Sequence, residues 1–158
     1  MFVTNHVLAG TIIGATCRRN VGLAFALGVA SHVAMDLTPH WGEKDPDPGD
    51  FLRIARRDGL LGLGAMTAVL VAGVPPRRTL LAGILGAAAL DADKPGKHFF
   101  GRSPFPRFVD AFHTAIQRER PDLGPRELAY GAVLATGAVG ALVRQRRRGA
   151  LGGAAATG

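Results

Sequence analysis

Five apolar segments, each about 13–17 residues long, dominate this chain, and the short breaks between them restrict how it can fold. The first break is CRRN, and a later break, PPRR, contains paired prolines that cannot continue a helix. Both breaks are typical of tight turns between antiparallel helices. We therefore predict an all-α fold, a compact up-and-down bundle of about five helices. The apolar segments span residues 5–17, 21–37, 58–74, 78–92 and 127–143.

Two polar stretches interrupt the series of apolar segments. Residues 38–57 are rich in Asp, Pro and Gly, and we expect a loop there with a short helix near DFLRIARR. Residues 94–126 form a longer excursion, within which apolar side chains recur at helical spacing. This periodicity predicts one amphipathic helix, lying on the bundle or at a membrane interface. The side chains at helical spacing are Phe105, Phe108, Val109, Phe112 and Ile116.

The two ends of the chain differ from its interior. Thr4 or Asn5 is expected to cap the first helix, because a short polar side chain accepts hydrogen bonds from its free N–H groups. No secretory signal peptide is predicted, since no basic segment precedes the first apolar run. We expect residues 1–143 to form a single helical domain. Residues 144–158 are basic and then rich in Gly and Ala, and we expect them to form a disordered tail.

The apolar segments also bear on whether the bundle lies in water or in a membrane. A comfortable membrane span needs about 20 residues, so length alone favours neither environment. The segments LLGLGAMTAVLVAGV and LAYGAVLATGAVGALV, however, are apolar on every face, which a soluble bundle rarely requires. Gly and Ala are dense in the segments, and the Gly10-x-x-x-Gly14 spacing lets helices approach closely in lipid. A transmembrane bundle is the prediction, and a soluble bundle with an anionic partner is the alternative.

Charge is segregated when the segments are arranged as alternating hairpins. The chain carries 19 Lys and Arg against 12 Asp and Glu, a net charge of +7. The arrangement gathers every acidic residue and all five histidines at one end, which we call the histidine end. Basic residues in short loops stay cytoplasmic, so we expect a multi-pass protein of the cytoplasmic membrane whose arginine end and C-terminal tail lie inside. The arginine end receives Arg18, Arg19, Arg77, Arg78, Arg144, Arg146, Arg147 and Arg148.

Some classes of function are excluded by what the sequence lacks. Zinc-finger spacing, RNP motifs and aromatic residues interleaved with basic ones are absent, so no nucleic-acid partner is expected. Cys17 is the only cysteine and falls at the arginine end, away from every histidine, so it is not expected to act as a nucleophile. A single cysteine cannot form an internal disulfide, so the sequence does not indicate whether the protein lies in an oxidising or a reducing compartment. Membrane lipids are the expected partners.

The sequence SHVAMDLTPHW places two imidazoles and a carboxylate at the histidine end. His32 and Asp36 are four residues apart and share one face of a helix. Pro39 biases Thr38 away from helical geometry, so the helix is expected to end nearby and His40 to lie just beyond it. Imidazole and carboxylate groups together suit zinc or a similar divalent ion. The alternative is a helix end that carries polar residues to the membrane surface.

A second cluster, LDADKPGKHFFGR, closes the fourth apolar segment at the same end. Asp91 and Asp93 form either a carboxylate pair that holds one ion or bridges two, or a polar helix end before a turn. His6 and His113 are each either a metal ligand or a surface histidine, and His98 is expected to be exposed. The neighbouring basic residues hold an anionic group, contact lipid headgroups or face solvent; they are Lys94, Lys97, Arg102, Arg118 and Arg120.

These motifs resemble those of the small bacterial integral-membrane proteins known as membrane-bound metal-dependent hydrolases. That family carries an early histidine, matched here by His6, and an Asp-x-Asp segment closing a helix, matched by Asp91 and Asp93. It also carries a later histidine-bearing stretch, which is reduced here to AFHTAI with His113 alone. SHVAMDLTPHW is similar to a signature of a related group of small membrane proteins. The resemblance covers roughly residues 4–120, and Leu90 stands where the family has a proline.

The residues and the resemblance together imply a membrane-embedded hydrolase with a divalent metal, Zn²⁺ being the first choice. The substrate would be an ester or an anionic, lipid-like phosphoester at the membrane interface, with Asp93 or Asp36 as general base. The alternative is a non-enzymatic membrane protein in which the same residues form a structural metal site or a polar cluster. The predicted ligands are His6, His32, Asp36, His40 and Asp91, followed by Asp93 and His113.

Overall fold

A computed structural model describes residues 1–17, 19–42, 48–74 and 76–154. Within these ranges the regular secondary structure is helical apart from two very short strands, and turns or loops connect the elements, so the predicted all-α class is confirmed. The α-helices are α1 (Val3–Thr16), α2 (Val21–Asp36), α3 (Pro48–Val71), α4 (Arg77–Ala88), α5 (Asp93–Phe100), α6 (Arg107–Ile116) and α7 (Gly124–Ala154). The shorter elements are β1 (His40–Trp41), β2 (Glu119–Arg120) and the 3₁₀ segments η1 (Leu90–Ala92) and η2 (Pro121–Leu123).

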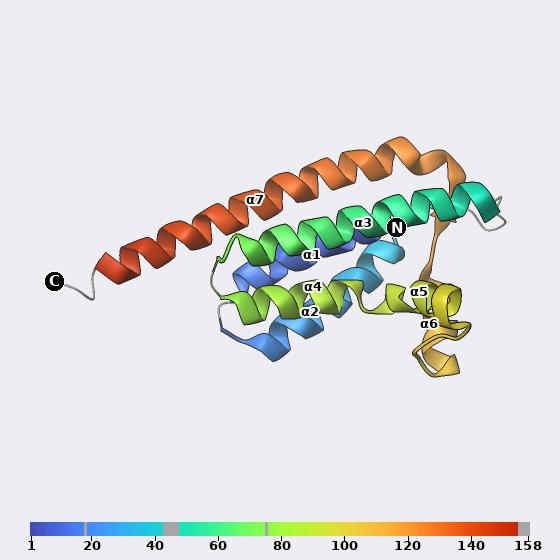
Figure 1. The fold of residues 1–158 in the computed structure, drawn as a ribbon, viewed down its shortest axis with the longest axis horizontal. Coiled ribbons are helices and arrows are strands. Elements are labelled where there is room, and N and C mark those ends of the chain that lie inside the picture. The colour runs from blue at the N-terminus through green and yellow to red at the C-terminus, as the bar shows by residue number, and fades with distance from the viewer. Residues whose placement is uncertain (18, 43–47, 75, 155–158) are drawn as a thin grey trace.

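Helices α1, α2, α3, α4 and α7 run alternately in opposite directions along the long axis of the molecule (Figure 1). Helix α4 packs against both α1 and α2, while α3 and α7 pack on α1. The alternation brings the start of α1 and the ends of α2 and α4 to the same end of the bundle. Helices α5 and α6 lie at that end as well (Figure 1). Residues that are far apart in the sequence therefore meet there.

Glycines set the close spacing between α4 and its two neighbours. A Cβ atom added to Gly10 of α1 would lie 2.5 Å from the carbonyl oxygen of Gly83 in α4. A Cβ atom on Gly28 of α2 would lie equally close to that oxygen, at 2.5 Å. The backbones of the three helices thus approach each other without side chains between them, which is the packing that small residues permit in lipid.

Helix α2 buries its small and polar residues and exposes its large apolar ones. A helix of a soluble bundle does the opposite and turns its apolar stripe toward the core. The buried residues of α2 are Ala24, Gly28, His32 and Asp36. The large apolar residues Val21, Leu23, Phe25 and Leu27 are each 43–47% exposed. The apolar core inside the bundle is correspondingly small, with Val7, Ala15, Val69, Val74, Leu80 and Ile84 as its buried members.

Among the described residues, one helical stretch is long and apolar enough to cross a membrane by length and composition. It is Pro121–Ala150, of which 11% of the most apolar window is buried. Helix α2 is apolar but shorter, at 16 residues. Length and composition therefore support one of the five membrane spans that the sequence predicts.

Three helix boundaries differ from the predicted ones. The short helix near DFLRIARR and the third apolar segment form the single helix α3, because no proline separates them. The sequence DKPGKHFF forms α5 rather than a turn, and Pro95 fits its first turn, where a missing N–H costs nothing. Helix α7 runs to Ala154, so residues 144–154 of the expected disordered tail are helical, and Arg and Ala are strong helix formers. Residues 155–158 of that tail, and Arg18 of the arginine end, lie outside the described residues.

The start of α1 is capped from another helix rather than by Thr4 or Asn5. The Asp58 carboxylate of α3 accepts hydrogen bonds from the backbone N–H groups of Val3 at 2.6 Å and of Thr4 at 3.2 Å. A carboxylate satisfies these free donors and also interacts favourably with the positive end of the helix dipole. The Asn5 side chain is thereby left for a different contact, described below.

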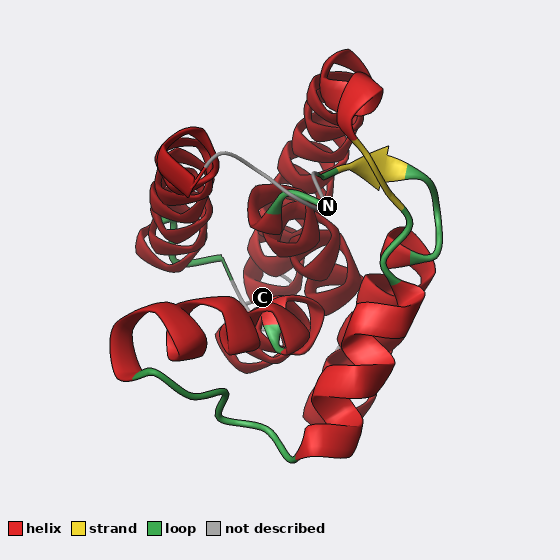
Figure 2. Cartoon of the chain, turned by 90° about the vertical axis from the view of Figure 1, so that its right-hand side faces the viewer, coloured by secondary structure: helices red, strands yellow, loops and turns green. Residues whose placement is uncertain are grey.

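The two strands fasten the chain after α6 to the end of α2. They pair in parallel with His40 opposite Glu119, beside the N-terminus (Figure 2). The Arg118 N–H also donates to the backbone oxygen of Asp36 at 3.1 Å. Because α6 immediately precedes β2, this pairing holds His113 of α6 against the last turns of α2.

Candidate metal centre

Five of the predicted ligands converge at the histidine end, although they belong to four different elements. His6 lies on the first turn of α1, His32 and Asp36 on the last turns of α2, Asp91 on η1 and His113 on α6. Their nitrogen and oxygen atoms form two groups, His6/His32/Asp36 and His32/Asp91/His113, within each of which the atoms lie no more than 4.8 Å apart. Every residue of both groups is buried. Such a cluster could hold a metal ion.

Asp36 lies at the centre of the cluster. Its Oδ2 atom is 3.0 Å from His32 Nε2 and 3.4 Å from His113 Nε2, and its Oδ1 atom is 3.3 Å from His6 Nε2. The nitrogen of the Met1 amino group lies 3.5 Å from the same Oδ1 atom. Asp36, His6 and His32 are completely buried, at 0% exposure. Three imidazoles therefore turn the same ring nitrogen toward one carboxylate that water does not reach.

A backbone carbonyl on the far side of the His32 ring determines that the Nε2 atom, which faces the cluster, is the hydrogen-bond acceptor of the neutral ring. His32 Nδ1 lies 2.6 Å from the Ala87 carbonyl oxygen, and a carbonyl oxygen only accepts, so Nδ1 donates its proton there. In the neutral ring, Nε2 then presents a lone pair to the interior of the cluster. This is the arrangement usual for metal-binding histidines, whose second nitrogen is held by a carbonyl or a carboxylate. The His6 ring stacks on His32, with centroids 4.0 Å apart.

Several polar atoms in the cluster have no hydrogen-bond partner among the described residues, although buried polar groups normally have one. They include His6 Nε2, Asp36 Oδ2 and Asp91 Oδ2. All of these atoms face the same small space. Oxygen atoms of carboxylates and nitrogen atoms of neutral imidazoles are acceptors, so a cation satisfies them together. The donor set, nitrogen and carboxylate oxygen without sulfur, fits a divalent ion such as Zn²⁺.

Asp93 lies behind His113 rather than in either group of three. Its Oδ1 atom is 3.5 Å from His113 Nδ1, and its Oδ2 atom accepts a hydrogen bond from Lys97 Nζ at 2.9 Å. Lys94 Nζ donates to Asp91 Oδ1 at 2.8 Å in the same way. Each carboxylate of the Asp-x-Asp segment is thus paired with a lysine at the edge of the cluster.

These neighbours shift the pKa values at the mouth of the cluster. Burial alone raises the pKa of Asp91, but Lys94 and the nearby imidazoles lower it to about 2, so the carboxylate is charged. Burial alone lowers the pKa of His113, but the carboxylates of Asp36 and Asp93 raise it to about 9. Without a metal ion, His113 therefore holds a proton at neutral pH.

His40, also predicted as a ligand, is not part of either group. Its Nδ1 atom lies 2.8 Å from the Thr38 carbonyl oxygen, and its Nε2 atom is buried with no hydrogen-bond partner among the described residues. His98 is exposed on α5, as predicted. Of the other predicted anion-binding residues, Arg102 and Arg118 are exposed. Arg120 pairs with Asp122 at 3.0 Å.

Three further polar residues at this end were not singled out as site residues by the sequence. Glu127 of α7 is 1% exposed, and its Oε2 atom accepts a hydrogen bond from Asn5 Nδ2 at 3.0 Å. The Gln117 amide nitrogen lies 3.0 Å from His113 Nε2. The signal for Glu127 was its position at the start of the last apolar segment, since a charge inside such a segment is costly and usually functional.

Comparison with known proteins adds no evidence about the function of this cluster. No protein-family model, curated protein or solved structure matches the chain. The burial, the orientation of the imidazoles and the unpaired acceptor atoms are therefore the evidence for a metal centre.

Proposed function

We propose that this chain is a membrane-embedded, metal-dependent hydrolase of the kind that its motifs resemble. One observation carries the proposal. Three imidazole Nε2 atoms, from His6, His32 and His113, surround the carboxylate of Asp36 in a buried space, with Asp91 beside them. Nitrogen and carboxylate oxygen are the ligands of catalytic zinc sites, and Zn²⁺ is the ion we propose.

The membrane location is supported by where the large apolar side chains lie. Helix α2 turns them outward, and α7 exposes Leu128, Val133 and Val139 along the stretch that is long enough to span a bilayer. In water these surfaces would be apolar patches that soluble monomers avoid, whereas in lipid they cost nothing. We propose that the arginine end is cytoplasmic, following the rule that basic residues of short loops remain inside.

Aromatic residues support a location of the metal centre near the membrane surface. Phenylalanines on α5 and α6 point away from the bundle, although the periodicity of α6 allowed them to pack on it. Aromatic side chains exposed at one level of a membrane protein are typical of the bilayer interface. The exposed side chains at the histidine end are Phe99, Phe100, Phe108 and Phe112, with exposed fractions of 69%, 80%, 75% and 48%.

The residues around the centre have separable roles in the proposed reaction. A bound divalent ion would polarise a carbonyl or phosphoryl oxygen and lower the pKa of water. Asp36, at the centre of three imidazoles, suits a ligand better than a general base. Asp93 suits the role of orienting His113. Burial alone raises the pKa of Asp93, but His113 and Lys97 lower it, so Asp93 is a charged carboxylate that attracts the His113 ring. Lys94 has a side chain that is 41% exposed, so it is available to an anionic ester or phosphoester arriving from the interface.

A structural metal site in a non-enzymatic membrane protein is the second candidate. The complete burial of His6, His32 and Asp36 favours it, because structural sites are closed whereas catalytic sites keep one position open. The half-buried Gln117 and the exposed part of Lys94 favour an opening toward the surface. The two candidates therefore differ in whether substrate reaches the ion.

Metal analysis of the purified protein separates these functions. The intact protein is expected to retain Zn²⁺ through gel filtration and to hydrolyse a p-nitrophenyl ester or phosphodiester. His32→Ala should lose metal and turnover together, whereas His98→Ala, a histidine exposed on α5, should lose neither. Loss of metal and thermal stability from a protein that never had turnover would assign a structural site. A protein that binds no divalent ion would overturn both candidates.

Membrane extraction tests the location independently of the chemistry. The protein should stay in the membrane fraction after washing with sodium carbonate and should require detergent for release. Recovery in the soluble fraction would contradict the proposed location and favour the soluble bundle.

A further inference from the structure

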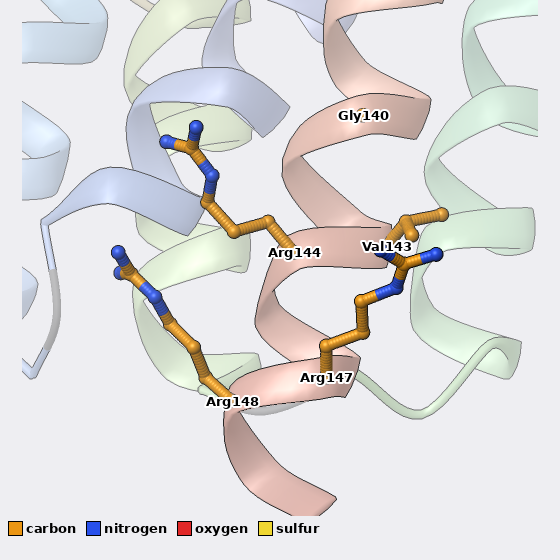
Figure 3. Close-up of a pocket in the computed structure, with 5 residues that line it drawn as sticks. All are labelled: Gly140, Val143, Arg144, Arg147 and Arg148. Atoms are coloured by element: carbon orange, nitrogen blue, oxygen red, sulfur yellow. The ribbon is translucent and has the colours of Figure 1, made fainter. Parts of the chain in front are cut away.

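The arginine end carries a hollow on α7 that the proposed reaction does not use. Its volume is about 330 Å³. Arg144 and Arg148 extend together to one side of the helix, and Arg147 extends to the other side, next to Val143 (Figure 3). Gly140 contributes no side chain, and a Cβ atom added there would meet nothing within 4 Å. The hollow therefore combines three guanidinium groups with an apolar wall.

The guanidinium groups around the hollow have no acceptor in the described part of the chain. Arg144, Arg147 and Arg148 make no hydrogen bond or ion pair there, and no carboxylate lines the hollow. Arg146, by contrast, donates to the Ala72 carbonyl oxygen at 3.2 Å and helps to fasten α7 to the end of α3. A guanidinium group is planar and always charged, and it matches the geometry of phosphate oxygens. The three free groups thus present a site for an anion.

The position of the hollow along α7 indicates where that anion lies. Arg126 and Arg144 are 18 residues apart, which corresponds to about 27 Å of helix axis. The hydrocarbon core of a bilayer is about 30 Å thick. Glu127 is the one charged residue of residues 127–143, and it is buried. When this stretch crosses the membrane, Arg144 and the arginines after it lie at the depth of the lipid phosphates.

We infer that this hollow binds the phosphodiester headgroup of an anionic phospholipid. Arg144 and Arg148, which extend to the same side of the helix, hydrogen-bond the phosphate oxygens, and Arg147 contributes its positive charge from the other side of the hollow. The first part of an acyl chain follows Gly140 and Val143 toward the exposed apolar face of α7. The apolar wall distinguishes this ligand from free phosphate, which has no apolar part to pack against it. The inference rests on the membrane location proposed above, and it is independent of the metal centre.

Lipid binding in detergent micelles tests the inference. Purified protein in an uncharged detergent is titrated with fluorescent phosphatidylglycerol or phosphatidylcholine, and the expected result is a clear preference for phosphatidylglycerol. Replacing Arg144, Arg147 and Arg148 together by Gln should weaken phosphatidylglycerol binding by a factor on the order of 100, since each arginine near an anionic lipid surface contributes about 1 kcal/mol. Gly140→Leu, which fills the hollow at unchanged charge, should weaken binding as well.

A matched triple variant at the same end controls for net charge. Arg19, Arg77 and Arg78 are exposed at the arginine end but lie outside the hollow, and their replacement by Gln should leave phosphatidylglycerol binding within about twofold. Equal losses in the two triple variants would overturn the inference, because they would indicate diffuse attraction. Equal binding of the two lipids would also overturn it, as would displacement of the lipid by inorganic phosphate or RNA at matched charge.

The failure of this inference and the failure of the proposed function have different signatures. His32→Ala should retain the preference for phosphatidylglycerol while losing metal. Release of the protein by carbonate would contradict the membrane location, whereas loss of lipid preference in a protein that stays in the membrane would contradict the headgroup site alone.

Discussion

The Nε2 atoms of His32 and His113 lie 3.2 Å apart, although 81 positions separate the two residues in the sequence. A partner at the Nδ1 atom orients each ring. The partner is the Ala87 carbonyl oxygen for His32 and the Asp93 carboxylate for His113. Two neutral imidazoles that face each other with lone pairs repel, so a proton or a cation belongs between them. Protonation and metal binding therefore compete for the same space.

This competition predicts how metal affinity depends on pH. The pKa of His113 is raised to about 9 in the metal-free protein, and a metal requires the neutral ring, so Zn²⁺ binding should release a proton below that pH. The apparent affinity should rise by about tenfold per pH unit toward pH 9 and then level off. Calorimetric titration with Zn²⁺ in buffers of different ionisation enthalpy measures the release. Binding without proton release at pH 7 would contradict the assignment of His113.

The same pKa shift also predicts how the stability of the metal-free fold depends on pH. Because the folded pKa of His113 lies above its ordinary value of 6.5, the proton stabilises the metal-free fold fully below pH 6.5. That stabilisation is lost as the pH rises through about 9. Thermal unfolding of the metal-free protein between pH 6 and pH 10 checks the direction, and His113→Gln should remove this part of the pH dependence.

Asp93→Asn tests the role assigned to the second carboxylate of the Asp-x-Asp segment. The substitution keeps the size of the side chain but removes the charge that orients His113. Metal affinity should fall by about 10- to 100-fold, the usual effect of losing a carboxylate behind a metal-binding histidine. The pH at which affinity levels off should also move down, because Asp93 helps to raise the pKa of His113. Competition with a chelating dye measures both effects.

The control for Asp93→Asn is Asp122→Asn. Asp122 is exposed and pairs with Arg120 at 3.0 Å, away from the cluster, so its loss should change neither affinity nor pH dependence. An equal drop in both variants would show that net charge, rather than the orientation of His113, governs metal binding.

The sequence predicted the convergence of the site because topology follows from the apolar segments and their breaks. Alternating helices bring the start of the first segment and the ends of the second and fourth to one end. His6, His32, Asp36 and Asp91 therefore lie at the same end of the bundle, where the packing brings their side chains together. The class of the fold followed from the same pattern.

The details that the sequence missed depend on contacts between distant side chains. His40 was predicted as a ligand, but β1 pairs with β2, and His40 is part of neither group of possible metal ligands. Glu127 is 122 positions away from Asn5 in the sequence. Its contact with Asn5 could be predicted only by knowing that the start of α7 packs against α1. The α-helical state of DKPGKHFF depends on α5 continuing from η1, which a local Lys-Pro-Gly-Lys pattern does not reveal.

Gly83→Ala tests the backbone contact that holds α1 against α4. The new methyl group would press on the backbone of Gly10, and overpacking of this kind costs about 1–3 kcal/mol of the free energy of unfolding. Because His6 lies on α1 and Asp91 lies on η1 just after α4, a change in the spacing of the two helices should also lower metal affinity. Gly64→Ala on α3 is the matched control, since a Cβ atom there meets nothing within 4 Å. It should stabilise the helix by about 0.5–1 kcal/mol. Thermal unfolding in detergent compares the variants, and equal midpoints would contradict close packing at Gly83.

Asn5→Ala tests whether the buried Glu127 is held in place by its partners. Asn5 Nδ2 donates to Glu127 Oε2 at 3.0 Å and to the Glu127 carbonyl oxygen at 3.3 Å, and the Phe2 N–H also donates to Oε2, at 3.1 Å. Removing the Asn5 amide leaves a buried carboxylate with the single backbone donor among the described residues. The free energy of unfolding should fall by about 1–3 kcal/mol, the cost of an unsatisfied buried polar group.

A second substitution separates the charge of Glu127 from the shape of its side chain. Glu127→Gln made in the Asn5→Ala background should recover part of the lost stability, because a neutral amide is less costly to bury without a donor than a carboxylate. Thr136→Ala, an exposed change on the same helix, should leave the free energy of unfolding within about 0.5 kcal/mol. Denaturant unfolding of the single and double variants gives the coupling energy between Asn5 and Glu127. Additive effects would show that the two side chains do not depend on each other.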